Sequence, residues 1–170
     1  MNKISNIDIL EKVNFKELKE LDLSFNRILD IKILEKVNFE KLKILNFETN
    51  RISNINILEK VNFKELKELN LYANFISNIK VLKKVKFDQL EKLDLGVNKI
   101  RDIDILENVN FRELKVLNLY KNQISDIEVF EKAKFEKLED LDVSVNNISR
   151  SYFSSTIIFL QLKLKKFRYW

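Results

Sequence analysis

Residues 66–76 read LKELNLYANFI, and the same spacing of Leu, Asn and Ile returns at residues 18–28, 90–100 and 114–124. A shift by one such period superimposes the sequence almost entirely on itself, so repetition is its dominant feature. The two Leu positions that flank residue 70 lie two residues apart, which predicts that both side chains share one face of a strand. The first position recurs as Leu21, Leu45, Leu69, Leu93, Leu117 and Leu141, and the second as Leu23, Phe47, Leu71, Leu95, Leu119 and Val143.

The segment that connects successive strands predicts a short helix. Residues 57–61, Ile-Leu-Glu-Lys-Val, carry a helical period, and Asn56 with Glu59 has the spacing of a capping box, as do two further Asp–Glu pairs, Asp8 with Glu11 and Asp104 with Glu107. A Phe follows each of these segments, and stacking of the repeats predicts a buried aromatic spine on the helical side. The Phe column comprises Phe15, Phe39, Phe63, Phe87, Phe111 and Phe135.

Each strand motif ends in an Asn that lies two residues before an Ile. The Asn column comprises Asn26, Asn50, Asn74, Asn98, Asn122 and Asn146. The complete pattern, L-x-x-L-x-L-x-x-N-x-I, resembles the leucine-rich repeat, and its continuation I-x-x-I-x-x-L-x-x-V is similar to the short repeats of the phosphatase-regulator and internalin subclasses. The repeats of those subclasses are shorter than the units of this chain, which include the additional Phe step. The resemblance spans residues 2–149.

The resemblance implies an α/β solenoid with a concave parallel β-sheet, short convex helices and an internal ladder of Asn side chains. A single repeat cannot bury its own apolar side chains, so stacking must supply the core. Residues 1–150 are expected to form six repeats preceded by an N-terminal half-repeat. Residues 151–170 are expected to form a degenerate seventh repeat that caps the last strand, in which Phe159, Leu162 and Phe167 keep the register of Phe135, Leu138 and Val143.

Composition argues against most catalytic chemistry. The chain has no Cys and no His, which removes thiol chemistry and the commonest general base. Asp22, Asp94 and Asp142 fall on repeats too far apart to share one water or one metal ion. We therefore expect no enzyme, no cofactor, no metal site and no small-molecule substrate. The first residues lack the apolar run of a signal peptide, and the expected location is cytoplasmic.

The net charge of +5 comes from the C-terminal tail. Arg150, Lys163, Lys165, Lys166 and Arg168 follow the last acidic residue, Asp142, so the preceding repeats are neutral overall. A basic stripe along the solenoid is not indicated, and we expect no nucleic-acid partner. Lys and Arg beside Tyr169 and Trp170 would suit an anionic membrane surface, although the alternation of Leu160, Leu162 and Leu164 with polar residues favours a capping strand.

The two positions that follow the second buried Leu column, such as Tyr72 and Ala73 in the third copy, differ among the six copies, as expected for a recognition surface. Tyr72 and Tyr120 lie two repeats apart, about 10 Å by strand spacing, and Gly96 between them predicts an open notch flanked by aromatic rings. Exposed Tyr often anchors interfaces. The candidate partner-binding residues are Glu48, Asn70, Tyr72, Phe75, Asp94, Asn118, Tyr120 and Lys121.

These observations predict a module that binds a protein or peptide on its concave face. Two alternatives remain open: peripheral membrane association through the basic aromatic tail, and a structural spacer within a larger repeat protein.

Overall fold

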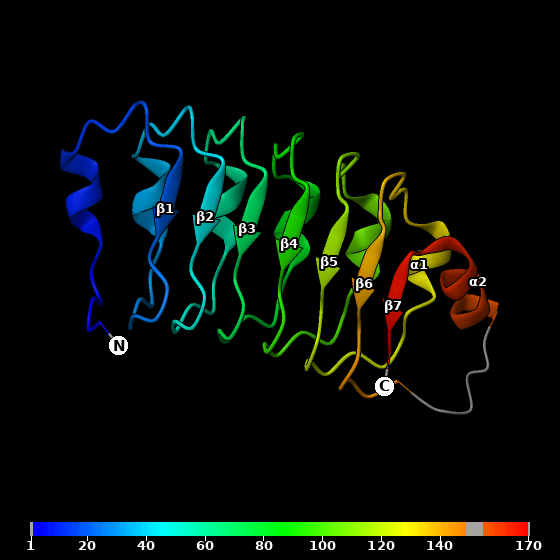
Figure 1. Ribbon diagram of the computed structural model, residues 1–170. Helices are drawn as coiled ribbons and strands as arrows, with labels where there is room; N and C mark the ends of the chain where they lie inside the picture. The colour runs from blue at the N-terminus through cyan, green and yellow to red at the C-terminus, as the bar shows by residue number, and fades with distance from the viewer. Residues whose placement is uncertain (1, 149–154, 170) are drawn as a thin grey trace.

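The computed structural model describes residues 2–148 and 155–169. Seven short strands form one parallel sheet in chain order, and the short helices that connect them lie together behind one face of this sheet (Figure 1). The predicted α/β solenoid is therefore confirmed. The strands are β1 (Glu20–Asp22), β2 (Ile44–Asn46), β3 (Glu68–Asn70), β4 (Lys92–Asp94), β5 (Val116–Asn118), β6 (Asp140–Asp142) and β7 (Lys166–Arg168).

The strands pair so that equivalent residues of the first six repeats lie side by side. Leu69 is opposite Leu45 on one side and Leu93 on the other, which is the register that the constant repeat length requires. These Leu side chains are buried at 1% exposure or less, together with the second Leu column from Phe47 to Leu119. The core is therefore a continuous stack of identical layers rather than a single central cluster.

The connecting elements on the convex side are mostly single turns of 3-10 helix. They are η1 (Asp8–Lys12), η2 (Lys32–Glu35), η3 (Asn56–Glu59), η4 (Lys80–Lys83) and η5 (Asp104–Asn108), followed by one α-helical turn, α1 (Val129–Lys132). The Phe spine is present beneath them, because Phe39, Phe63, Phe87, Phe111 and Phe135 are all buried. The rings of Phe39 and Phe63 are stacked, with centroids 6.3 Å apart.

The predicted capping boxes are wrong. Asn56 is the first residue of η3 rather than its cap, and its own backbone N–H donates to Asn54 Oδ1 at 2.9 Å. Asp8 and Asp104 are bonded in the same way by the Asx residue two positions earlier. In such an Asx turn, the side-chain oxygen of one residue accepts the backbone N–H two residues later. This bond satisfies the first N–H of the 3-10 turn, and a capping box is not needed.

Ion pairs on the outer surface join neighbouring repeats. Glu91 accepts hydrogen bonds from Lys115 at 2.6 Å and Lys67 at 2.8 Å, one from each adjacent repeat. These hydrogen bonds lower the pKa of Glu91 to about 2. The acidic and basic residues of the repeats therefore include links between layers, and not only solvated side chains.

The C-terminal segment does not follow the predicted register. Residues Ser155–Lys163 form an α-helix, α2, where the Leu alternation predicted a strand. Ile157, Leu160 and Leu164 are buried with helical spacing, whereas Leu162 is 84% exposed. Phe167 pairs with Leu141 rather than Val143, because the longer helix consumes more chain than a 3-10 turn and delays the strand. Residues 151–154 and Trp170 of the predicted cap lie outside the described residues, and so does Arg150 before it.

Candidate partner-binding face

The alternation of each strand creates the concave face. Leu69, Leu93 and Leu117 point into the core, so the residues on either side of them point away from it. We define the concave face as the outward positions of β1–β6 together with the residue two places after each strand. Six of the eight predicted binding residues belong to it, namely Glu48, Asn70, Tyr72, Asp94, Asn118 and Tyr120, and all six are half-buried.

The Asp and Asn column on this face has a structural duty that the sequence analysis missed. Asn70 Oδ1 accepts the backbone N–H of Tyr72 at 3.0 Å, and Asp94 Oδ1 accepts that of Gly96 at 2.9 Å. The same bond recurs in all six repeats, at Asp22, Asn46, Asn70, Asp94, Asn118 and Asp142. One oxygen of each side chain therefore terminates the strand, and only the second polar atom faces outward. The sequence did contain a sign of this role, because the column holds only Asp and Asn.

The notch predicted above Gly96 is not open. A Cβ atom at this position would lie 2.9 Å and 3.0 Å from two ring carbons of Tyr72, and 3.0 Å from Asn118 Nδ2. The Tyr72 ring therefore leans over Gly96 and occupies the room that the missing side chain provides. Burial raises the pKa of Tyr72, and the neighbouring Tyr120, Asp94 and Glu48 raise it further.

A hollow on the concave face is lined by residues of the strands themselves, and neither Tyr72 nor Tyr120 belongs to its lining. It has a volume of about 160 Å³ and spans three adjacent strands, β3, β4 and β5. The structure brings three of the predicted residues together there, Asn70, Asp94 and Asn118. The sequence analysis missed the other outward residues of its lining, which come from the position two residues before the Asx column: Glu68, Lys92 and Val116. We call this feature the concave hollow.

Asp94 is the acidic centre of the concave hollow. Burial raises its pKa, while hydrogen bonds from the Gly96 N–H and from Asn118 oppose that shift. The negative charges of Glu48 and Asp142 raise the pKa further. Among residues 2–148 and 155–169, neither Asp94 nor Glu48 takes part in an ion pair. Asp94 is therefore a partly desolvated carboxyl group that no cation of the described chain neutralises.

Phe75 and Lys121 lie away from the hollow, on the loops that leave the strands. Both are exposed, and the Phe75 ring carries the ammonium group of Lys99 at 4.7 Å from its centroid. Lys121 adopts a left-handed backbone with φ of 50°. Its whole column does so, with φ between 50° and 56° at Phe25, Thr49, Ala73, Val97, Lys121 and Val145. The residues of this column differ in type, but their backbone is constrained, because the left-handed conformation is unfavourable for non-glycine residues.

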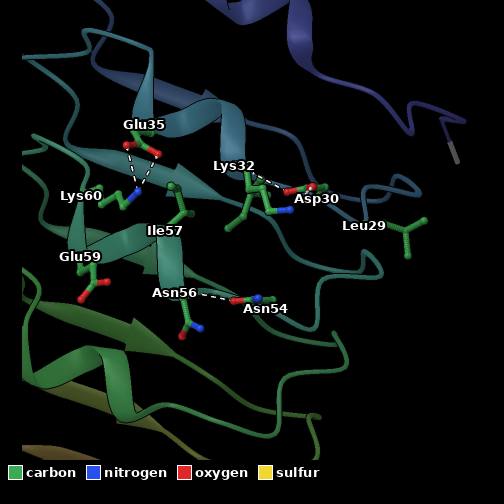
Figure 2. A pocket seen from close by; sticks show the side chains of 10 residues that line it. Leu29, Asp30, Lys32, Glu35, Asn54, Asn56, Ile57, Glu59 and Lys60 are labelled. Atoms are coloured by element: carbon green, nitrogen blue, oxygen red, sulfur yellow. Dashed lines mark hydrogen bonds and ion pairs between the residues drawn. The ribbon is translucent and has the colours of Figure 1, made fainter.

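A larger hollow of about 360 Å³ lies on the convex side, between the second and third repeats (Figure 2). Its charged side chains are already paired within the chain, Lys32 with Asp30, Lys60 with Glu35 and Glu59 with Lys84. Lys60 binds the carboxylate of Glu35 at 3.1 Å, and the Asn56 N–H donates to Asn54 (Figure 2). None of its lining residues was predicted as a binding residue. Since its charges are satisfied within the chain, size alone does not make it a recognition site.

The Asn ladder that the resemblance implied is confirmed. Asn74 Nδ2 donates to the carbonyl of Phe47 in the preceding repeat at 3.0 Å and to two carbonyls of its own turn. Its Oδ1 accepts the N–H of Ile52. Four bonds from one buried amide leave nothing for a ligand. The column therefore holds the strand ends in place beneath the concave face.

Comparison with known proteins agrees with this geometry. A family model for leucine rich repeats that describes two repeat copies matches residues 64–108 and 86–132, and a model for a single leucine rich repeat matches residues 17–36. No curated protein sequence matches the chain.

Solved structures share the fold. An internalin (inlF) from Listeria monocytogenes str. 4b F2365 is 27% identical with a TM-score of 0.79, over 97% of this chain and 44% of the internalin. An internalin C2 (inlC2) from the same strain is 23% identical with a TM-score of 0.63, over 88% of this chain and 71% of that one. The protein of a TLR13–ssRNA13 complex is 26% identical with a TM-score of 0.70, over 86% of this chain and 21% of that one. This chain thus spans less than half of the first internalin. The matched repeats and the shared solenoid together place the chain in the leucine-rich-repeat family.

Proposed function

We propose that the chain binds a protein or peptide partner on its concave face, centred on the concave hollow and the adjacent Tyr72 and Tyr120. Leucine-rich-repeat domains generally serve protein interaction, and this supports binding rather than catalysis. The observation that carries the proposal is the hollow itself. It joins side chains of three strands, and two half-buried aromatic residues, Tyr72 and Tyr120, follow two residues after Asn70 and Asn118 of its lining.

A capture experiment from source-organism lysate tests this proposal. The triple variant Tyr72→Ala/Tyr120→Ala/Asp94→Lys alters the concave face, and Glu35→Ala/Lys60→Ala alters the convex hollow as a matched control. Circular dichroism must first show that both variants are folded. We expect one specific partner that the concave variant loses and the convex variant retains. The reverse pattern would move the site to the convex side, and capture of nothing by the wild type would favour a spacer.

Membrane contact through the tail is a second candidate, and one observation favours it. Helix α2 exposes Ile158 and Leu162, at 51% and 84%, next to Lys163. Against it, three other basic residues of the tail, Lys165, Lys166 and Arg168, pair with acids of the sixth repeat. No helix within residues 2–148 or 155–169 has the length and apolarity needed to cross a bilayer. Co-sedimentation with anionic vesicles, and its loss in Leu162→Ser, would support this candidate. The cytoplasmic location also remains a prediction, which cell fractionation would test.

A further inference from the structure

The charge of the concave face opposes the charge of the whole chain. The protein carries +5, yet the outward positions of β1–β6 and the residues two places after each strand contain seven acids and one base. The acids are Glu20, Asp22, Glu48, Glu68, Asp94, Asp140 and Asp142, and the base is Lys92. Lys92 is itself held by Glu68 at 2.8 Å. A field of this sign attracts cationic groups to the face and repels anionic ones.

We propose that the partner is a basic segment, and that one of its arginine or lysine side chains enters the concave hollow and binds Asp94, while the rest of the segment lies along the face past Glu48 and the tyrosine rings. This inference rests on the proposed function, since it names the chemistry of the partner for the same face. Such a hollow is smaller than the usual pocket of a small-molecule ligand, and it suits a single side chain.

The chain already places one arginine on this face. In β7, Arg168 Nη2 lies 2.7 Å from Asp140 Oδ1, and Arg168 Nε donates to Asp142 Oδ2. Asp140 and Asp142 occupy in β6 the outward positions that Lys92 and Asp94 occupy in β4. Arg168 thus shows that a guanidinium group can bind the column of Asp94 and Asp142 on this face.

The concave face offers each contact that a basic side chain uses. The Asp94 oxygens accept one hydrogen bond each, from the Gly96 N–H at 2.9 Å and from Asn118 Nδ2 at 3.0 Å, which leaves acceptor capacity on both. Tyr72 and Tyr120 lie outside the lining of the hollow, two residues after Asn70 and Asn118 on the same face, where a second basic side chain of the segment can make a cation–π contact, a mode that Lys99 already uses on Phe75. Val116 provides an apolar wall for the methylene stem. A cation there would lower the raised pKa of Asp94.

Gly96 makes the inference directly measurable. It is the single glycine of the chain, and its amide N–H donates to Asp94, so its cross-peak in a ¹H–¹⁵N spectrum reports on that carboxylate. The probe is the peptide acetyl-Gly-Arg-Gly-Arg-Gly-amide at millimolar concentration, compared with the same peptide carrying neutral citrulline for arginine. We expect a saturable shift of the Gly96 peak with the arginine peptide and at most a small one with citrulline.

The variant Asp94→Asn tests the assignment without disturbing the strand end. Asn70 and Asn118 make the same bond to the backbone at the equivalent position, so the substitution keeps the Asx turn. We expect the affinity for the arginine peptide to fall about tenfold or more, since a charge-assisted hydrogen bond is lost. Asp22→Asn makes the same change three strands away, about 14 Å by strand spacing, and should reduce affinity less than twofold at 0.15 M salt.

Three results would overturn the inference: no saturable shift at Gly96, equal shifts with citrulline, or equal losses in Asp94→Asn and Asp22→Asn. The captured partner separates this inference from the proposed function. If the partner depends on Tyr72 and Tyr120 but binds Asp94→Asn as tightly as wild type and resists 0.3 M salt, the concave face is still the binding site. The basic-segment inference then fails alone.

Discussion

The two ends of the solenoid use the same repeat columns but bury them differently. Phe15 in the first repeat is 48% exposed, whereas Phe135 in the sixth is 3% exposed. Ile9 is 62% exposed, and its equivalent Val129 is 8% exposed. The motif is the same, so the difference comes from the neighbouring layer. In a solenoid the adjacent repeat decides how deeply a side chain is buried, and burial in turn decides how much that side chain contributes to the free energy of unfolding.

The C-terminal end has that additional layer. Strand β7 pairs with β6, and α2 contacts α1 on the convex side (Figure 1). At the N-terminal end the half-repeat before β1 contributes no strand: the Arg27 N–H donates to the carbonyl of Ile4, the Ile4 N–H donates to Asn26, and Lys36 pairs with Glu11. The contrast predicts that equivalent substitutions have unequal effects along the chain.

The largest effect is expected in the Phe spine. Phe63→Ala removes a side chain that is 1% exposed and stacked on Phe39, and it should destabilise the fold by about 3–5 kcal/mol. Phe15→Ala makes the same change at a half-exposed position and should cost about 1 kcal/mol or less. Urea denaturation followed by circular dichroism measures both. Equal costs would show that the first repeat is covered in solution.

The C-terminal layer is tested within one helix. Leu160 of α2 is 1% exposed, and Leu160→Ala should cost about 2–4 kcal/mol if this segment caps the solenoid. Leu162, two residues later, is 84% exposed, and Leu162→Ala should change stability by less than about 0.5 kcal/mol. Thermal melts of the two variants make the comparison. A Leu160→Ala melt that matches wild type would remove the capping role from residues 155–169.

The architecture was predictable because each repeat restates it. Six copies of one pattern indicate the strand, the Asn ladder and the Phe spine, so a departure from the pattern in one copy does not change the prediction. The seventh unit has no such support. Its leucines at 160, 162 and 164 satisfy a strand alternation, while Ile157, Leu160 and Leu164 satisfy a helical period, and contact with α1 decides for the helix.

The concave face was predictable in position but not in detail. The Asx column and the tyrosines were found because they differ from the core columns. The collapse of the Tyr72 ring onto Gly96 depends on a rotamer, which periodicity does not specify. The acidic character of the face was hidden by a repeat region that is neutral in total. It emerges only when charges are sorted by the direction in which each position points.

The Asn ladder should show a smaller version of the contrast between layers. Asn74→Ala leaves the buried N–H of Ile52 and a carbonyl of the preceding repeat without partners, and should cost about 2–3 kcal/mol. Asn26 is half-buried, its Nδ2 donates to two carbonyls of its own turn, and its Oδ1 accepts from the exposed Ile4, so Asn26→Ala should cost about 1 kcal/mol. The difference in urea midpoint at constant m-value measures this. A larger loss of stability in Asn26→Ala than in Asn74→Ala would contradict the idea that the adjacent repeat sets the cost of a substitution.

The smallest effect should be independent of the neighbouring layer. Thr49 and Val145 are β-branched residues with left-handed backbones, φ 54° and 55°, in the second and the sixth repeats. Because this strain lies within one residue, Thr49→Asn and Val145→Asn should each stabilise the fold by about 0.5–1 kcal/mol, since Asn tolerates the conformation better. Differential scanning calorimetry of both variants measures the gain. A gain at one site alone would show that packing against the next layer, and not local backbone geometry, sets the energy of this turn.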